Sequence, residues 1–179
     1  MDAVTLLRND HKTVEALFKK FEKAGPNAHK TKQDLVEKIV EELSIHAAIE
    51  EQVLYPAARD AVPDATEEVL EALEEHHVVK WTLSELDGMD PGDERFTAKV
   101  TVLIENVRHH VEEEEQELFP ILEGALDSDT LEAMAKKLRM AEKLAPTHPH
   151  PHAPESAVGN MVLGPFVAMV DKVRDALHR

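Results

Sequence analysis

The chain contains no cysteine among its 179 residues. This absence excludes disulfides, thiolate zinc sites, iron–sulfur clusters and cysteine nucleophiles. The sequence does contain 11 histidines and 36 acidic residues. Imidazole and carboxylate groups are therefore the side chains available for binding a metal ion.

Aromatic residues are also scarce, at 4% of the chain, although 42% of it is hydrophobic. Few aromatics together with abundant Ala, Glu, Leu and Lys favour helices. Positive charge is in short supply as well, and the formal net charge is −16. This charge argues against a nucleic-acid partner and against binding to anionic membranes, because both attract basic surfaces. Most of the acidic residues are expected to form a solvated surface.

The sequence has no long hydrophobic run. No stretch approaches the roughly 20 apolar residues that a membrane-spanning helix needs. The first residues, Met1-Asp-Ala-Val-Thr5, lack the basic and apolar regions of a secretory signal. We therefore expect a cytoplasmic protein with no membrane partner.

One motif occurs twice, at residues 46–56 and 110–120. Both copies read His-x-x-x-Glu-Glu-Gln-x-Leu-aromatic-Pro. Residues i and i+4 of a helix lie on one face, about 40° apart. The first copy therefore directs His46 and Glu50 to the same side, and the second does so with His110 and Glu114. A nitrogen and an oxygen ligand presented twice is what a pair of metal ions would need.

The duplication extends beyond this motif. Asp10-His11-x-x-Val14 corresponds to Glu75-His76-x-x-Val79, and each lies at nearly the same distance before its motif copy. Apolar residues at helical spacing predict four long helices, over about 2–24, 31–54, 65–86 and 93–118. A duplicated helix pair with short turns predicts an all-α fold, an up-down-up-down four-helix bundle over residues 1–126.

Residues 127–179 are predicted to form a C-terminal extension with additional helices. A helix over 129–144 is mixed in character, so we expect it to pack on the outside of the bundle. The segment 146–154 alternates histidine with proline, which favours a solvated extended linker over a weak surface metal site. An amphipathic helix over about 165–178 would dock on the bundle or on a second subunit, so a monomer and a homodimer are both open.

Proline follows the aromatic residue of each motif copy. Proline pushes the preceding residue out of the α region, so the helix is expected to kink or break at Tyr55. Glu51 and Glu115, which follow the motif glutamates, could orient ligands or move protons. We interpret both as solvated surface carboxylates.

Six residues recur at matched positions: His11, His46, Glu50, His76, His110 and Glu114. Any one of them alone would be an ordinary surface or core residue. Together they would bring one histidine from each helix to the same depth, with two glutamates one turn away. Buried His and Glu are costly unless they are paired or bind a metal, so the set predicts a metal site. Imidazole with carboxylate and no thiolate suits a pair of iron or manganese ions better than a single zinc.

This order of residues, His…His-x-x-x-Glu…His…His-x-x-x-Glu, resembles the hemerythrin-like, HHE cation-binding family over about residues 1–125. The resemblance implies an oxo- or hydroxo-bridged centre of two non-haem iron ions, with manganese as an alternative. It implies that the four histidines are terminal ligands and that Glu50 and Glu114 are bridging ligands. Lys80 stands where oxygen-carrying hemerythrins have the second histidine of a His-x-x-x-His pair. This departure disfavours reversible oxygen storage.

Tyr55 is the only tyrosine in the chain. A bacterial subgroup of hemerythrin-like proteins has a tyrosine between the first His-x-x-x-Glu and the third histidine, and this sequence is similar. A regular helix would point Tyr55 away from Glu50, whereas a break before Pro56 would redirect it toward the site. Metal ligation and core packing of the ring both stay open.

The subgroup resemblance implies catalase-like removal of hydrogen peroxide. The main alternative is a sensor or storage protein that binds oxygen, nitric oxide or iron without turnover. A ferritin-like iron oxidase would need paired Glu-x-x-His motifs, and Glu74-x-x-His77 occurs only once. A metal-free structural bundle is disfavoured by the matched set of six residues.

Overall fold

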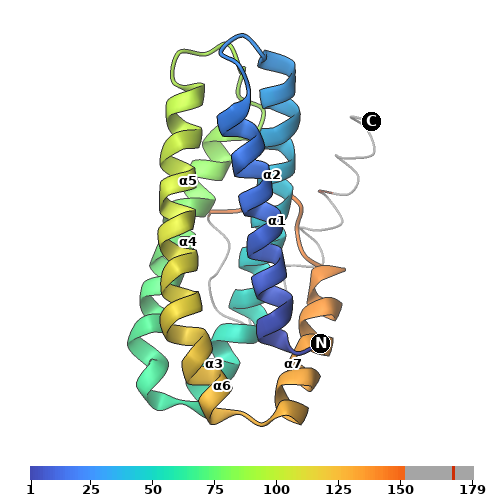
Figure 1. The fold of residues 1–179 in the computed structure, drawn as a ribbon, viewed down its shortest axis with the longest axis vertical. Coiled ribbons are helices and arrows are strands. Elements are labelled where there is room, and N and C mark those ends of the chain that lie inside the picture. Colours follow the sequence, from blue (N-terminus) through green and yellow to red (C-terminus); the bar gives the residue numbers. More distant parts are fainter. Residues whose placement is uncertain (152–170, 172–179) are drawn as a thin grey trace.

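The computed structural model describes residues 1–151 and residue 171. All regular secondary structure in this part of the chain is helical. The four long helices are α1 (Ala3–Lys23), α2 (His29–Ile49), α4 (Thr66–Leu86) and α5 (Phe96–Glu113). They run alternately up and down the long axis, which confirms the predicted up-down-up-down bundle (Figure 1). Of the helix predicted over 165–178 only residue 171 is described, and the end of the linker lies outside the described residues.

The ends of the helices follow local sequence signals. The Asp2 carboxylate caps α1 by accepting a hydrogen bond from the Thr5 amide at 2.8 Å. Asp127 caps the later helix α7 (Ser128–Glu142) in the same way, through the Thr130 amide. After α4 the chain turns at Gly88, whose φ of 77° is a conformation that glycine adopts without strain.

The motif copies do not break the helix, so the expectation that Pro56 pushes Tyr55 out of the α region is wrong. Tyr55 keeps helical angles, with φ −64° and ψ −42°, and its amide bonds to the carbonyl of Glu50. The residues before it form the π-helical segment η1 (Glu50–Leu54), and Glu114–Leu118 form its counterpart η3. A π turn moves the preceding carbonyls away from their α-helical positions, so the proline ring that follows does not collide with them.

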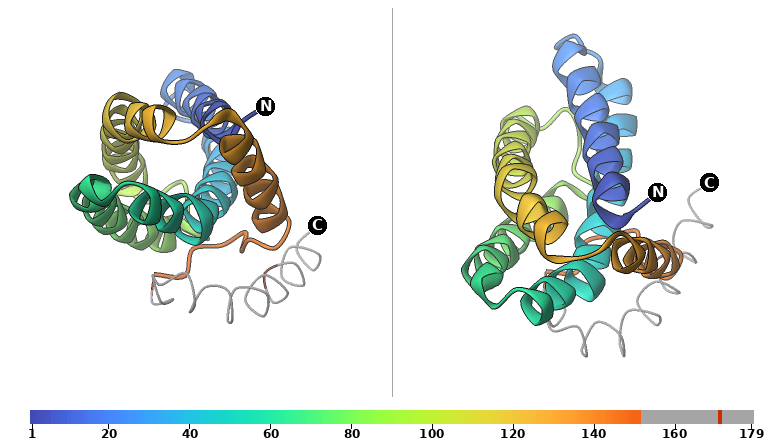
Figure 2. Two further views of the ribbon diagram at one scale, coloured as in Figure 1. Left: turned by 90° about the horizontal axis from the view of Figure 1, so that it is seen from below. Right: turned by 60° about the horizontal axis from the view of Figure 1, so that its bottom comes forward.

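Short helices close the lower end of the bundle (Figure 1). They are α3 (Tyr55–Ala61), the 3₁₀ turn η2 (Pro63–Ala65) and α6 (Phe119–Ala125). Helix α7 lies beside α1 and α2 (Figure 2). Its buried face, Leu131, Met134, Ala135 and Leu138, belongs to the lower apolar cluster. The helix was expected on the outside of the bundle, and the structure shows that one of its faces completes the core.

Two apolar clusters fill the bundle, one above the other. The lower one includes Leu7, Ile49, Tyr55, Phe119 and Leu138. The upper one is built from residues such as Phe18, Ile39, Leu83, Phe96 and Leu103. Each long helix passes from one cluster to the other at its predicted histidine, so a polar layer crosses the core between them.

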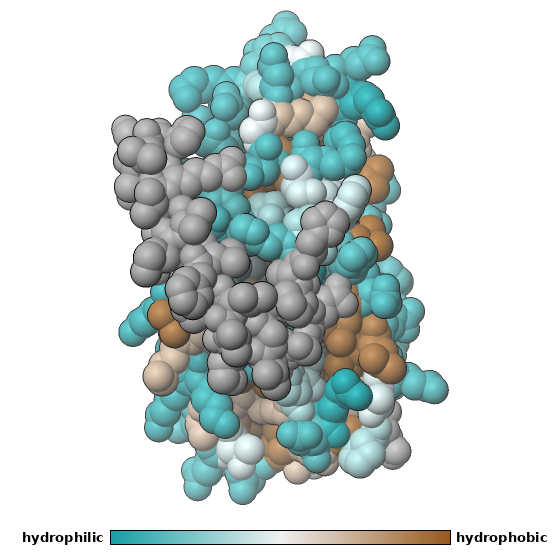
Figure 3. Space-filling view, turned by 180° about the vertical axis from the view of Figure 1, so that it is seen from behind, coloured by the Kyte–Doolittle hydropathy of each residue, from teal (hydrophilic) through white to brown (hydrophobic). Residues whose placement is uncertain are grey.

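The outer surface is largely hydrophilic on the face seen in Figure 3, where apolar side chains gather only in small groups. This agrees with a formal net charge of −16. Among the described residues, no helix combines the length and the apolar character that crossing a membrane requires.

Candidate metal centre

The polar layer contains all six residues of the predicted set. His11, His46, His76 and His110 come one from each long helix and are 2–6% exposed. Glu50 and Glu114 lie at the start of the two π-helical segments and are 0% and 2% exposed. The duplicated sequence therefore folds so that its matched positions meet at one depth in the core.

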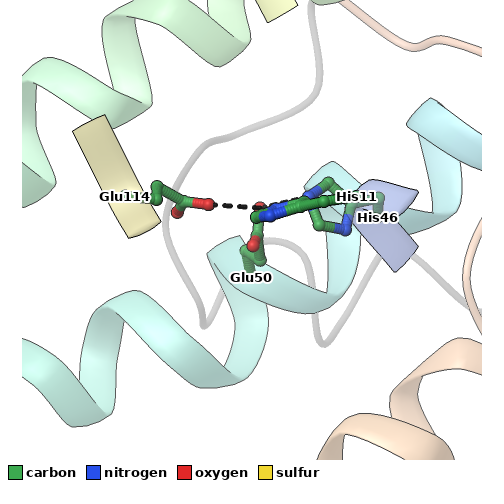
Figure 4. A group of neighbouring side chains, drawn as sticks. All are labelled: His11, His46, Glu50 and Glu114. Atoms are coloured by element: carbon green, nitrogen blue, oxygen red, sulfur yellow. Dashed lines mark ion pairs between the residues drawn. The ribbon is translucent and has the colours of Figure 1, made fainter. Parts of the chain in front are cut away.

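Each glutamate reaches histidines of two helices. Glu50 Oε2 lies 3.2 Å from Nε2 of His46 and 3.3 Å from Nε2 of His76. Glu114 Oε2 lies 3.4 Å from Nε2 of His11 and 3.7 Å from Nε2 of His110. Figure 4 shows His11, His46, Glu50 and Glu114 pointing toward one another. All four histidines thus present the same ring nitrogen to the carboxylates.

The side chains form two overlapping groups that could each hold a cation. One group is His11, His46, Glu50 and Glu114, and the other is Glu50, His76 and His110. Within each group, one potential ligand atom per residue lies within 4.8 Å of the others. Because Glu50 belongs to both groups, the two groups are adjacent and share a carboxylate.

The unpaired atoms of the layer fit a metal. His11 Nε2, His46 Nε2, both oxygens of Glu50 and Glu114 Oε2 are buried without a hydrogen-bond partner. Burying such atoms unpaired costs free energy, and a cation between them would remove that cost. The residues therefore fit metal binding, and imidazole with carboxylate is a donor set typical of iron.

The ionisation of the two glutamates differs in this environment. Burial raises the pKa of Glu50 well above its usual value, and the nearby Glu114 carboxylate raises it further. Burial also opposes ionisation of Glu114, but His110 and His11 hold its pKa well below the usual range. Burial and mutual repulsion thus disfavour two ionised carboxylates in the layer, and a cation between them would offset both effects.

The π-helical segments aim one aromatic ring each at the layer. The Tyr55 hydroxyl donates a hydrogen bond to Glu114 Oε1 at 2.9 Å and lies 3.2 Å from His76 Nε2. Burial raises the pKa of Tyr55 well above its usual value. Phe119, its counterpart in the repeat, stacks on the His11 ring with centroids 5.7 Å apart. The structure therefore turns the Tyr55 hydroxyl toward the site while its ring packs in the core, through a wider turn of the helix and not through a break.

Glu51 and Glu115 are not the solvated carboxylates that we expected. Glu51 is 4% exposed and lies 3.1 Å from His76 Nδ1 and 2.8 Å from Lys80 Nζ. Glu115 is half-buried and lies 2.9 Å from His11 Nδ1, where it also accepts a hydrogen bond from Arg8. A carboxylate that accepts from Nδ1 leaves Nε2 of the same ring directed at the metal.

A third carboxylate holds His110. Glu75 Oε2 lies 2.7 Å from His110 Nδ1, a role that the sequence reasoning missed. The available signal was its place directly before His76, which matches Asp10 before His11. In the repeat, Asp10 is the counterpart of Glu75 and His46 is the counterpart of His110. The Asp10 side chain is one methylene shorter than that of Glu75, and Nδ1 of His46 has no hydrogen-bond partner. The fourth histidine therefore lacks the support that the other three have.

Several hollows reach the layer. A cavity of about 20 Å³ lies against the four histidines, and its remaining walls include Val14, Leu43, Val79 and Val107. This is room for about one water-sized molecule. A larger groove of about 810 Å³ runs between α1 and α5 and reaches His11 and Glu115. Only a very small ligand would fit beside the histidines themselves.

A helical bundle with a buried histidine–glutamate layer that fits metal ions is a cation-binding four-helix bundle protein. The family model described as "Hemerythrin HHE cation binding domain" matches residues 2–122. The chain therefore belongs to this hemerythrin family, and the resemblance noted in its sequence is confirmed.

Relatives agree with the family assignment. The chain is 30% identical to an uncharacterised hemerythrin-like protein of Schizosaccharomyces pombe, over 95% of this chain and 83% of that one. It is 28% identical to a DNA nickase of Nostoc sp., over 79% of this chain but only 39% of the nickase. A crystal structure of a hemerythrin HHE cation binding domain-containing protein from Mycobacterium kansasii matches with a TM-score of 0.68 and 24% identity, over 80% of this chain and 86% of that one. That likeness concerns the fold.

Proposed function

We propose that this protein holds two non-haem iron ions and breaks down hydrogen peroxide in a catalase-like reaction. The observation that carries the proposal is the pair of buried ligand groups that share Glu50 beside a cavity of about 20 Å³. Two adjacent cations and one very small ligand are what such an arrangement accommodates. The donor set suits iron, with manganese as the alternative.

The residues divide between the two ions by proximity. His11 and His46 would hold one ion, and their ring centroids are 4.9 Å apart. His76 and His110 would hold the other, with their Nε2 atoms 3.1 Å apart. Glu50 and Glu114 would bridge the ions, because each carboxylate contacts a histidine of both pairs. Tyr55 lies against His76, where it would bind that ion as a phenolate or, if it keeps its proton, act as a proton donor.

When bound, a pair of iron ions supplies two-electron redox chemistry, by which one peroxide is oxidised to dioxygen and a second is reduced to two waters. The chain would hold and shield this centre. Glu51, Glu75 and Glu115 fix the rings of His76, His110 and His11 through their Nδ1 atoms. The hydrogen bond between Tyr55 and Glu114 places a transferable proton beside the site. The valines around the cavity exclude bulk water and larger substrates.

The second candidate is a sensor or storage protein that uses the same centre without turnover. The small cavity favours it as much as it favours peroxide, because dioxygen and nitric oxide are of similar size. The buried tyrosine at the centre favours the enzyme, because it offers a proton to the site. The name of the Nostoc relative raises DNA as another substrate. The net charge of −16 opposes contact with a phosphate backbone.

The test is metal analysis and a visible spectrum of protein made in iron-replete cells, followed by peroxide consumption and oxygen release. We expect about two irons per chain and oxygen release that is lost in His110→Ala. The matched control is His29→Ala, since His29 is exposed and far from the layer. Bound iron without oxygen release would favour the sensor. A chain with no metal, or with a single zinc, would refute the di-iron proposal.

A further inference from the structure

The two halves of the repeat differ in the side chains on their outer faces at the level of the metal layer. On one side, α7 covers α1, α2 and η1. The covered positions are apolar: Ala3, Leu6, Ile45, Ile49 and Val53, all packed in the cluster that includes Leu138. In the second half, the corresponding positions are polar: Glu68, Glu71, His109, Glu113 and Glu117. No described helix covers them.

These polar residues face one another across α4 and α5. A hollow of about 40 Å³ lies between the two helices, and four of its lining residues are Glu68, Glu71, Glu113 and Glu117. Glu75, His110 and Glu114 also line it. The hollow therefore connects an acidic outer face with side chains of the buried metal layer.

Three side chains at the outer end of this hollow are of the kinds that bind metal ions. His109 Nε2 lies 3.3 Å from Glu113 Oε1 and 3.8 Å from Glu75 Oε1. These three side chains can place one ligand atom each within 4.8 Å of one another. His109 is well exposed, with 62% of its side chain accessible, so a hydrated cation can reach the group.

The inner end of the hollow also points to a cation. Glu114 is 2% exposed, lines the hollow, and has an Oε2 atom without a hydrogen-bond partner. Glu75 joins the two ends. Its Oε2 holds His110 Nδ1 at 2.7 Å, while its Oε1 belongs to the outer group. The two oxygens of the Glu75 carboxylate therefore contact different histidines, one in the buried layer and one at the surface.

We propose that Glu75, His109 and Glu113 form a surface divalent-cation site that loads iron into the buried centre. The inference rests on the proposed metal centre and adds the route by which it is filled. The acidic residues around the hollow concentrate divalent cations at its mouth, since a cleft lined by one sign of charge raises the association rate of the opposite charge. The corresponding face of the first half is closed by α7, so loading uses the second half.

The first experiment times the uptake of Fe²⁺ by metal-free protein in air-free buffer. Glu113→Gln/Glu117→Gln is expected to fill about tenfold more slowly than the unaltered chain, with the same final iron content. The matched control is Glu37→Gln/Glu41→Gln, which removes the same charge at the same spacing from an exposed face of α2. The control should load at nearly the unaltered rate. Equal rates in all three proteins would overturn the proposal.

The second experiment measures the surface site directly with Mn²⁺, whose free ion gives a strong paramagnetic resonance signal. The iron-loaded chain should bind about one further Mn²⁺ weakly, and His109→Ala/Glu113→Gln should lose this binding. No additional binding by the unaltered chain would overturn the surface site. If the chain takes up no iron at all, the di-iron proposal fails. Mn²⁺ binding that depends on His109 would then still support the surface site by itself.

Discussion

The hydroxyl of Tyr55 lies 2.9 Å from Oε1 of Glu114, although the two residues belong to different halves of the duplicated sequence. The other half has no equivalent bond, because Phe119 occupies the matching position and stacks on His11. The tyrosine oxygen is therefore one point at which the duplicated site is asymmetric. That oxygen also lies 3.2 Å from His76 Nε2, next to only one of the two proposed ions.

Replacing Tyr55 with phenylalanine removes this oxygen and keeps the ring. We expect the bundle to fold and to load iron, with a loss of stability near 1 kcal/mol for the missing hydrogen bond. If the phenolate binds iron, a broad visible absorption band will be present in the unaltered protein and absent from Tyr55→Phe. Peroxide turnover should fall roughly tenfold or more, in line with loss of a proton-transfer group. An unchanged spectrum and unchanged turnover would make Tyr55 a packing residue.

Glu51 and Glu115 hold equivalent histidines, but their environments differ. Glu51 is 4% exposed and also bonds to Lys80, whereas the Glu115 side chain is 32% exposed. Loss of such supporting carboxylates typically weakens metal affinity about 10- to 100-fold. We expect Glu51→Gln to lie at the upper end of this range and Glu115→Gln at the lower end. Competition with a chelator of known affinity measures both, and a weaker effect at Glu51 would contradict the role assigned to its burial.

The helices and the six residues of the layer could be predicted because their signals are local or repeated. Helical spacing of apolar residues gave four long helices, and the duplicated motif gave the shared depth of His46 and His110. The π-helical segments could not be predicted, since a π turn keeps its backbone in the helical region and is distinguished by its hydrogen-bond partners. The break expected before Pro56 follows from a rule for ordinary α-helices, and the wider turn removes the steric clash on which that rule depends.

Long-range contacts account for the other differences. Glu51 sits in an acidic run, and nothing in that run indicates that Lys80 and His76 approach it from another helix. The mixed sequence of α7 does not indicate that one of its faces is buried. Leu131 and Leu138 become core residues only because they join the cluster that contains Leu6 and Ile49. Glu75 had one usable signal, the acidic residue before each of His11 and His76.

Helix α7 can be tested as part of the core through Leu138, which is 0% exposed. Leu138→Ala should destabilise the protein by about 2–5 kcal/mol, the usual cost of such a truncation in a packed core. Met140 lies on the same helix but is 67% exposed, so Met140→Ala should change stability by less than about 0.5 kcal/mol. Denaturant unfolding of both variants provides the comparison. Equal, small effects would place α7 outside the cooperative core.

Arg108 joins α5 to α1 across the large groove through Glu15 and Glu22. Its hydrogen bonds are the largest cause that lowers the pKa of Glu15 below the usual value of 4.5. A lowered folded-state pKa means that this stabilisation is present above pH 4.5 and is lost as the pH falls through the folded pKa. Arg108→Ala should cost less than about 1 kcal/mol at pH 7 and low salt, because the pair is exposed.

The check on Arg108 is a set of unfolding curves for both proteins from pH 7 down to pH 3. The difference between the unaltered chain and Arg108→Ala should shrink toward the acid end and with added salt. Lys19→Ala is a useful control, since it removes a cation at an exposed i,i+4 pair with Glu15 and does not bridge two helices. A difference that grows as the pH falls would contradict the assignment.

The buried polar layer implies that the site lowers the stability of the metal-free protein. Glu50 is 0% exposed and neither of its oxygens has a hydrogen-bond partner. Replacing it with leucine of similar size removes an unsatisfied group, so metal-free Glu50→Leu should be more stable than the metal-free unaltered chain, by about 1–3 kcal/mol. Iron should raise the melting temperature of the unaltered chain. At a free iron concentration 100 times the dissociation constant, the free energy of unfolding should rise by roughly 2.7 kcal/mol.

The same iron should leave the melting temperature of Glu50→Leu almost unchanged, because a bridging carboxylate is missing. The stability difference between the two proteins therefore shrinks or reverses when iron is added: Glu50→Leu is the more stable protein after chelation, whereas only the unaltered chain gains stability in iron. Thermal melts with and without iron measure all four states. A metal-free Glu50→Leu that is less stable than the unaltered chain would mean that the carboxylate serves packing or hydrogen bonding in its own right. The layer would then not be held in place for a metal.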